Sequence, residues 1–480
     1  MTITNPMDIV ARQDFKLLIN GELVAGASMV DVVDPSLGVA VAQSPVADKD
    51  QVEQAVEAAR AAFPQWRETP IEERAAVLHG LADALEQAAD DLAQIVVLEQ
   101  GKLLANARAD VDWAVLWVRY FADLRLDPET VRDDDEALVQ IHRRPLGVVA
   151  AITPWNFPVF QAVYKIAPAI LAGNTVVLKP SPTTPLNALM LGRILADIVP
   201  AGVVNVVADD GSIGPILTAH PGIDKVSFTG STLVGKSVMR NAADTLKRTT
   251  LELGGNDAVV ILDDADLDKV VPEIFSYAFL NNGQVCLGIK RIFAHSSVYE
   301  RVCDEFAWMA DAMKLGSGMD AKSEMGPMQN AKQYAAAKRL LEVARQDGKV
   351  IAGGTVDDAS GYYVRPTVVR DIDEASELVT EETFAPIRSV MSFDDDADVI
   401  ARVNNTPYGL GNSVWGGDLE RAARIAGQLE SGTTWVNTHL ALAPDVPFGG
   451  RKQSGIGFEF SREGLLQFTD VHVVHINKTR

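Results

Sequence analysis

Two side chains in this sequence could together carry out covalent catalysis. Cys286, one of two cysteines in the chain, ends the polar, glycine-containing stretch at residues 281–286. Upstream, Glu252 lies beside the paired glycines at 254–255. A thiol that ionises is a nucleophile, and a carboxylate can take a proton from water. These residues could form and then hydrolyse an acyl intermediate if the fold brings them together.

The second cysteine, Cys303, has a different setting. Apolar residues recur at helical spacing around it, over residues 298–307. A cysteine on such a face is usually a small buried residue of the core. We therefore expect Cys303 to be structural and Cys286 to be reactive.

A proline-flanked loop holds a third polar candidate. Asn156 lies within residues 153–158, directly after a predicted strand at 147–152. Its amide could donate a hydrogen bond to a developing oxyanion, and losing such a donor costs roughly 3–4 kcal/mol. A purely structural turn is the alternative interpretation.

Two further strand ends could bind a nucleotide. Gly230 and Ser231 join a strand to a helix, and a helix N-terminus favours phosphate. The second glycine of the usual dinucleotide motif is missing, so an ordinary capped helix is the alternative. Lys179 also ends a strand, where ligands of parallel sheets bind, or it is simply solvated. Glu252 follows Gly230 by about 20 residues, so the residues alone also allow it a ribose-binding role.

The elements that must position these residues change along the chain. A hairpin is predicted at residues 16–22, followed by amphipathic helices at 48–62, 71–88, 92–104 and 109–124. From residue 147, strands alternate with helices, which predicts a parallel sheet with helices on its faces. The predicted strands are 147–152, 175–179, 203–207 and 225–228, and the helices are 185–198, a segment ending near 219, and 233–246.

A second alternating series begins with a strand at 258–262 and runs past residue 432. Its predicted helices are 267–280, 298–313, 331–346 and 419–428. Two alternating segments, 137–144 and 468–476, read as exposed strands of the kind that form pairing edges. For 137–144, a plain surface hairpin is the alternative.

Composition narrows the class of protein. A length of 480 residues predicts two or three domains. A net charge of −22 argues against nucleic acid and anionic membranes as partners. We see no signal peptide and no apolar run long enough to span a bilayer. Two cysteines cannot build a disulfide framework, so we expect a cytoplasmic protein.

These motifs, taken together, resemble the NAD(P)-dependent aldehyde dehydrogenase superfamily over nearly the whole chain. The matching segments are 154–158 (PWNFP), 228–231 with Gly235 (FTGS), 251–255 (LELGG), 281–286 (NNGQVC), 381–386 (EETFAP), 404–410, 447–450 (PFGG) and 454–455. Each motif is moderately specific, and their order and spacing also agree with the family.

The resemblance implies an α/β fold with three parts. A Rossmann-type parallel-sheet cofactor domain would occupy 1–124 and 146–253, and an α/β catalytic domain 254–458. A small β bridging or oligomerisation element would comprise 125–145 and 459–480. Members of the family are homodimers or homotetramers.

The resemblance also implies roles for individual residues. Cys286 would be the nucleophile, Glu252 the general base and Asn156 the oxyanion donor, with Lys179 counted beside them. NAD or NADP would contact Ile152, Thr153, Pro154, Trp155, Lys179, Ser181, Pro182, Gly230, Ser231, Val234, Leu253, Glu382 and Phe384. The aldehyde would contact Phe157, Phe160, Gln161, Tyr164, Leu287, Leu442 and Phe448. No metal is implied.

The chain departs from the family pattern in two places. Pro182 stands where NAD-preferring members often have Glu, so NADP use is plausible; Phe458 stands where Arg is common. The implied substrate residues are mostly apolar and none is cationic, which favours a medium-sized apolar or aromatic aldehyde over a semialdehyde bearing a carboxylate. The presence of Glu252 favours hydrolysis over acyl transfer to coenzyme A.

Two other classes of function would make different demands on these residues. A thiol hydrolase or acyltransferase would use Cys286 without redox chemistry and would need no nucleotide turn. A non-catalytic structural relative, as lens-type proteins of this fold can be, would tolerate loss of the Cys, Glu or Asn. A candidate nucleotide turn is present and all three positions are filled, so both alternatives are disfavoured.

Overall fold

The fold is built on two large β-sheets. The computed structural model describes residues 6–357 and 360–480; residues 1–5 and 358–359, which fall within predicted domain ranges, lie outside it. The first sheet has the order β2-β1-β9-β8-β7-β10-β11-β21. Its strands are β1 (Leu17–Ile19), β2 (Glu22–Val24), β7 (Val148–Ile152), β8 (Thr175–Lys179), β9 (Val204–Val206), β10 (Lys225–Thr229), β11 (Arg248–Glu252) and β21 (Gly455–Ile456). Strands β9, β8, β7, β10 and β11 run parallel.

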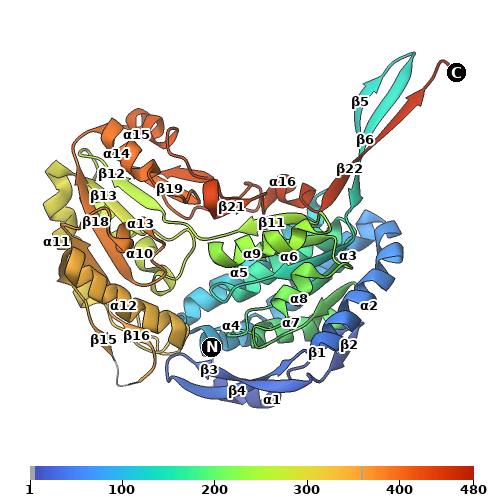
Figure 1. Ribbon diagram of the computed structural model, residues 1–480, viewed down its shortest axis with the longest axis horizontal. Coiled ribbons are helices and arrows are strands. Elements are labelled where there is room, and N and C mark those ends of the chain that lie inside the picture. Colours follow the sequence, from blue (N-terminus) through green and yellow to red (C-terminus); the bar gives the residue numbers. More distant parts are fainter. Residues whose placement is uncertain (1–5, 358–359) are drawn as a thin grey trace.

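The second sheet lies beside the first, on the left of Figure 1. Its order is β14-β17-β18-β13-β12-β19-β20, and only the edge pair β14–β17 is antiparallel. The strands are β12 (Ala258–Ile261), β13 (Arg291–His295), β14 (Lys349–Ala352), β17 (Thr367–Arg370), β18 (Ile387–Phe393), β19 (Gly411–Trp415) and β20 (Thr433–Val436). The predicted α/β class with parallel sheets is therefore confirmed.

Most predicted helices form, with shifted ends. Helix α2 (Lys49–Glu68) continues beyond the predicted end at residue 62 and accommodates Pro64. Helix α4 (Ala89–Gln100) stops earlier than predicted because Gly101 adopts φ +88° and ends it. Helices α3 (Ile71–Gln87), α5 (Leu104–Asp123), α7 (Leu186–Ala196), α8 (Gly214–Ala219), α9 (Thr232–Ala243), α10 (Leu267–Phe279), α11 (Ser296–Ala312), α12 (Ala331–Asp347) and α15 (Leu419–Ala426) correspond to the other predicted segments.

Helix α6 (Pro158–Leu171) had no individual prediction. Every one of its residues is buried, so it lacks the polar face that makes an amphipathic helix visible in a sequence. It packs against α5, beside which it lies near the centre of Figure 1, and against β8. This helix carries three of the predicted substrate residues, Phe160, Gln161 and Tyr164.

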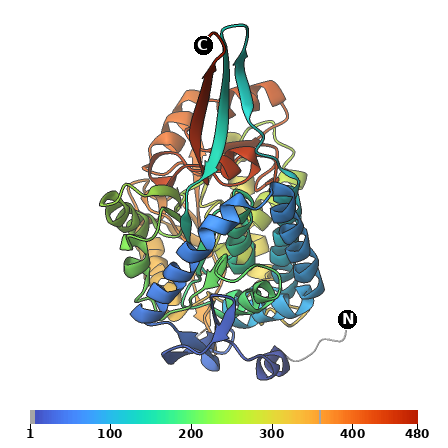
Figure 2. The same ribbon diagram turned by 90° about the vertical axis from the view of Figure 1, so that its right-hand side faces the viewer.

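A three-stranded antiparallel sheet projects from the body of the molecule (Figures 1 and 2). Strand β6 (Ala137–Pro145) pairs with β5 (Glu129–Asp133) on one side and with β22 (Thr469–Asn477) on the other. Both exposed strands expected from the sequence therefore form, and they pair with each other. Val471, Val473 and Ile476 of β22 are exposed, which leaves an apolar edge on this projection.

No described helix combines the length and apolar character needed to cross a membrane. Within residues 6–357 and 360–480, no cluster of three or more His, Cys, Asp or Glu side chains is arranged to hold a metal ion.

Candidate active site

A tight reversal of the chain presents Cys286. Helix α10 ends at Phe279, and Asn281 and Asn282 then adopt left-handed φ values of 50° and 59°, followed by Gly283 at 71°. Such consecutive left-handed residues cost free energy and persist only where surrounding contacts hold them. Gln100 and Gln284 supply such contacts, since each donates a side-chain hydrogen bond to Asn281. The reversal brings Cys286 out of the core and into a cavity.

This cavity, of about 290 Å³, brings the two predicted reactive residues together. Cys286 and Glu252 both line it. So do all seven predicted substrate residues: Phe157, Phe160, Gln161, Tyr164, Leu287, Leu442 and Phe448. No Lys, Arg or His belongs to the lining formed by the described residues.

Sequence reasoning missed much of the aromatic wall. Trp113, Trp117 and Phe460 also line the cavity. The rings of Trp117 and Phe160 meet edge-on at 4.9 Å, and Phe448 stacks on Phe460 at 5.3 Å. The two tryptophans lie four residues apart on α5, a helical spacing that could have been read from the sequence. No spacing pattern in the sequence indicated that Phe460 would line the cavity.

Glu252 is a buried carboxyl at the end of β11. Its side chain is 2% exposed, and neither carboxylate oxygen has a hydrogen-bond partner among the described residues. Burial raises the pKa of Glu252 well above its ordinary value, the charge of Glu459 raises it further, and Lys165 and the nearby Gly450 amide oppose the shift. The carboxyl can therefore hold a proton at a pH where an exposed Glu has lost it.

The two thiols differ in their access to the cavity rather than in their pKa values. Burial raises the pKa of Cys286 to about 12 and that of Cys303 to about 11. Cys303 is fully buried on α11, within an apolar cluster. Cys286 is half-buried and lines the cavity, so it alone can meet a ligand there.

Asn156 is held against the Cys286 loop. Its Nδ2 donates to the carbonyl of Gln284 at 3.1 Å, and its own carbonyl accepts from the Lys102 ammonium at 2.7 Å. One of the two amide hydrogens is thus used by Gln284. Asn156 supports the loop and is not among the residues that line the cavity.

The predicted cofactor residues gather at one edge of the first sheet. Four adjacent parallel strands, β8, β7, β10 and β11, end there. The residues Ile152, Thr153, Pro154 and Trp155 end or follow β7; Lys179, Ser181 and Pro182 end or follow β8; Gly230, Ser231 and Val234 follow β10; and Leu253 follows β11. The carboxyl ends of parallel strands are where α/β sheets bind ligands.

The turn into α9 presents a capped helix N-terminus at this edge of the sheet. The Ser231 hydroxyl caps the helix by accepting from the Val234 amide at 3.4 Å. A Cβ at Gly235 would lie 2.4 Å from the Leu253 side chain, so glycine is required for this close approach. The helix therefore starts beside the ends of β10 and β11 with free N–H groups.

Lys179 has a partner that the sequence did not reveal. Its ammonium lies 2.6 Å from the carboxylate of Asp209, which is completely buried. Lys179 also donates to the carbonyl of Pro180 at 3.1 Å. Asp209 lies in the loop after β9, the next strand of the sheet, so only the strand order brings the pair together.

Glu382 and Phe384 reach this edge from the second sheet's side, in the loop after α13 (Glu377–Thr380). The Glu382 carboxylate accepts from the Gly255 amide at 3.1 Å, and a Cβ at Gly254 would lie 2.2 Å from that carboxylate. The rings of Trp155 and Phe384 meet at 5.4 Å. The predicted cofactor residues of both halves thus converge.

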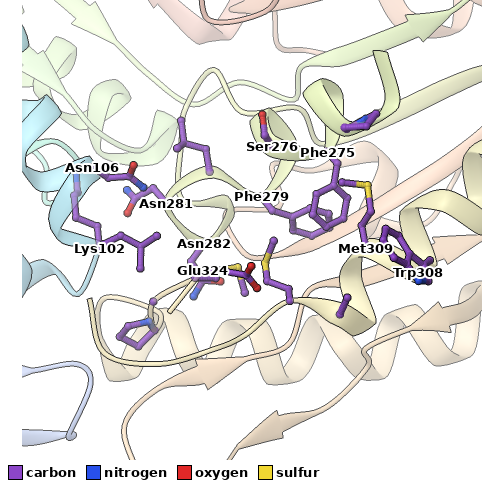
Figure 3. A pocket seen from close by; sticks show the side chains of 18 residues that line it. Lys102, Asn106, Phe275, Ser276, Phe279, Asn281, Asn282, Trp308, Met309 and Glu324 are labelled. Carbon is purple, nitrogen blue, oxygen red and sulfur yellow. The ribbon is translucent and has the colours of Figure 1, made fainter. Parts of the chain in front are cut away.

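A larger hollow, of about 460 Å³, lies beside the reversal at Asn281 and Asn282 (Figure 3). On one side it is lined by Lys102, just before α5, and by Asn106 in the first turns of α5, and on the other by helices α10 and α11. Neither Cys286 nor Glu252 lines it, and the chemistry therefore belongs to the smaller cavity.

Two parallel-sheet units with a thiol and a carboxyl in one cavity define an α/β enzyme of the dinucleotide-binding type. The chain belongs to the aldehyde dehydrogenase family, whose sequence model matches residues 23–474. It is therefore an oxidoreductase that oxidises an aldehyde in an NAD(P)-dependent reaction.

Individual proteins similar to this chain are also named as aldehyde or semialdehyde dehydrogenases. The chain is 38% identical to the 2-aminomuconic semialdehyde dehydrogenase of Bos taurus over 95% of this chain and 97% of that protein. It is 36% identical to the succinate-semialdehyde dehydrogenase [NADP(+)] of Escherichia coli over 95% and 96%. An aldehyde dehydrogenase of Bacillus cereus, solved as an NAD+ complex, superposes with a TM-score of 0.96 at 36% identity over 99% of both chains.

Proposed function

We propose that this enzyme oxidises a medium-sized apolar or aromatic aldehyde to its carboxylic acid through a thioester on Cys286. The observation that carries the proposal is the aromatic-walled cavity that holds both Cys286 and Glu252. A nucleophile and a base on one small cavity can act in turn on the same carbon atom.

Attack comes first. The Cys286 thiolate adds to the aldehyde carbon and forms a thiohemiacetal whose oxygen carries negative charge. The free amide hydrogen of Asn156 and the Cys286 backbone N–H would stabilise that oxyanion. The Gln284 contact holds the Asn156 amide against the loop that carries Cys286.

The residues at the sheet edge fit a dinucleotide. NAD(P)+, when bound, supplies the acceptor for the hydride that leaves the thiohemiacetal carbon. Ser231 and the α9 N-terminus would hold its phosphates, and Lys179 and Glu382 its two riboses. Gly254 leaves room for the Glu382 carboxylate at the edge of the site, and the Trp155–Phe384 pair provides an apolar wall. Loss of hydride leaves a thioester on Cys286.

Hydrolysis completes the cycle. Glu252, once deprotonated, takes a proton from water, and the resulting hydroxide attacks the thioester carbonyl. The carbon–sulfur bond then breaks, the acid leaves and the Cys286 thiolate returns. Burial without a fixed partner leaves the Glu252 carboxylate free to accept that proton.

A semialdehyde bearing a carboxylate is the second candidate substrate, since two relatives are named for such compounds. The cavity of this chain offers no cation among the described residues to pair with a carboxylate. An unpaired carboxylate in an apolar wall costs several kcal/mol. We therefore favour an uncharged substrate tail.

Both cofactors are proposed. With Pro182 at this position there is no carboxylate to repel the 2′-phosphate of NADP. In the opposite direction, Asp209 neutralises the nearby positive charge of Lys179, which would otherwise attract that phosphate. An NAD preference above about 100-fold in kcat/KM, roughly 2.7 kcal/mol, would contradict the Pro182 argument.

We further infer the three-part division at residues 124/125, 145/146, 253/254 and 458/459, and self-association as a homodimer or homotetramer through the exposed edge of β22. A cytoplasmic location fits the two free thiols.

The deciding experiment combines one variant with one substrate panel. Cys286→Ala should abolish aldehyde oxidation and keep dinucleotide binding. Aromatic, aliphatic and carboxylated aldehydes are compared with NAD and NADP by reduced-nicotinamide absorbance. Turnover by Cys286→Ala near that of the wild type would exclude the mechanism, and a preference for carboxylated aldehydes would exclude the proposed substrate class.

A further inference from the structure

A buried ammonium lies directly behind the nucleophile. Lys290 lies four residues after Cys286 in the same loop, and its side chain is 0% exposed. Its Nζ donates to the backbone carbonyl of Cys286. Its own amide donates to the carbonyl of Asp257 at 2.9 Å. The lysine therefore ties the Cys286 loop to the start of β12.

Lys290 belongs to a buried group of charges drawn from several elements. Its Nζ lies 3.9 Å from the carboxylate of Glu382, in the loop after α13. Asp257, before β12, is 2% exposed and interacts with the same ammonium. Arg388 of β18, Glu252 of β11, His439 after β20 and Tyr164 of α6 also interact with Lys290 or Cys286.

We propose that Lys290 is a positioning residue. It fixes the Cys286 loop and supplies the positive charge that favours the thiolate form of Cys286. The proposal rests on Cys286 being the nucleophile. Attack on the aldehyde needs a Cys286 thiolate, and no described residue that lines the cavity carries a positive charge. The buried Lys290 ammonium, which donates to the backbone carbonyl of Cys286, provides the compensating charge from behind the cavity wall.

The electrostatics have a defined sign. Burial raises the pKa of Cys286, Lys290 opposes that rise, and Glu382, Asp257 and Glu252 add to it. Burial lowers the pKa of Lys290, and the carboxylates of Asp257 and Glu382 oppose that shift in turn. Removing the ammonium should make the thiol harder to ionise, and removing the Glu382 charge should make it easier.

Alkylation tests this without aldehyde or cofactor. Each variant is made in a Cys303→Ala background so that one thiol remains. The rate of modification by iodoacetamide, in which the thiolate displaces iodide, is followed from pH 6 to pH 10 by intact mass. Lys290→Met should react at least about ten-fold more slowly at pH 8 and shift its pH profile upward by about one unit. Lys290→Arg, which keeps the charge, should recover to within about three-fold of the parent.

Two results would overturn the proposal. The first is a Lys290→Met protein, folded by circular dichroism, whose pH profile superimposes on that of the parent. If Lys290→Met does not fold, Glu382→Gln decides, because its profile must shift downward; an unchanged or raised profile refutes the assigned charge. An active Cys286→Ala enzyme would remove the proposed function through a different measurement, so the two failures are distinguishable.

Discussion

Replacing Glu252 by Gln should separate the two halves of the reaction. The amide keeps the size of the side chain but cannot accept a proton from water. Attack by Cys286 and loss of hydride do not use Glu252, so one equivalent of reduced nicotinamide per site should still form rapidly. Thioester hydrolysis should then slow by about 10²–10⁴-fold, the usual contribution of a positioned general base.

Stopped-flow absorbance of the reduced nicotinamide measures both phases. Glu252→Asp is the matched control, because it keeps a carboxylate and withdraws it by one methylene; its second phase should lie between those of wild type and Glu252→Gln. Steady turnover by Glu252→Gln within about three-fold of the wild-type rate would refute the assignment of the base and require another carboxylate on the cavity.

The same variant should be more stable than the wild type. Because the pKa of Glu252 is raised on folding, the unfolded chain loses this proton first and the folded state loses stability as pH rises above the ordinary Glu range. Each pH unit between the unfolded and folded pKa costs about 1.4 kcal/mol, so the gain of Glu252→Gln should grow by at most about 4 kcal/mol from pH 5 to pH 8. Thermal melts at the two pH values measure it, and a gain that is larger at pH 5 would contradict the sign.

Three further predictions concern other residues. Asn156→Ala should lower kcat by about 10²–10³-fold while dinucleotide binding is unchanged, measured by steady-state kinetics and fluorescence titration; an intact kcat would exclude its oxyanion role. Lys165→Met strands the buried Glu459 carboxylate, now 2.7 Å from the Lys165 ammonium, and should cost about 3–5 kcal/mol, seen as a lower Tm that the added Glu459→Leu change largely restores. The wild-type kcat should rise with pH as Glu252 deprotonates, a limb absent from the Glu252→Gln profile, and a profile that falls instead would argue against a carboxylate base.

Local pattern determined the class of fold and most of its elements. The alternation of strands and helices after residue 147 predicted parallel sheets because period and element length are properties of the chain itself. Helix α6 escaped individual prediction for the opposite reason: a helix buried on all sides has no polar face to reveal it. The shifted ends of α2 and α4 depended on whether Pro64 and Gly101 terminate a helix, which packing decides.

The sequence by itself also singled out Cys286 over Cys303, through the polar, glycine-containing setting of one and the helical setting of the other. Only the tertiary structure placed Glu252 on the same cavity and brought Asp209 to Lys179 and Lys290 to Glu382. Each of these pairings joins residues from different strands and loops. The order of the strands determines how close the charged groups lie, and therefore how strongly they interact. The sequence shows which residues have side chains capable of catalysis. The neighbours that shift their pKa values come from segments distant in sequence, so only the packing of those segments determines them.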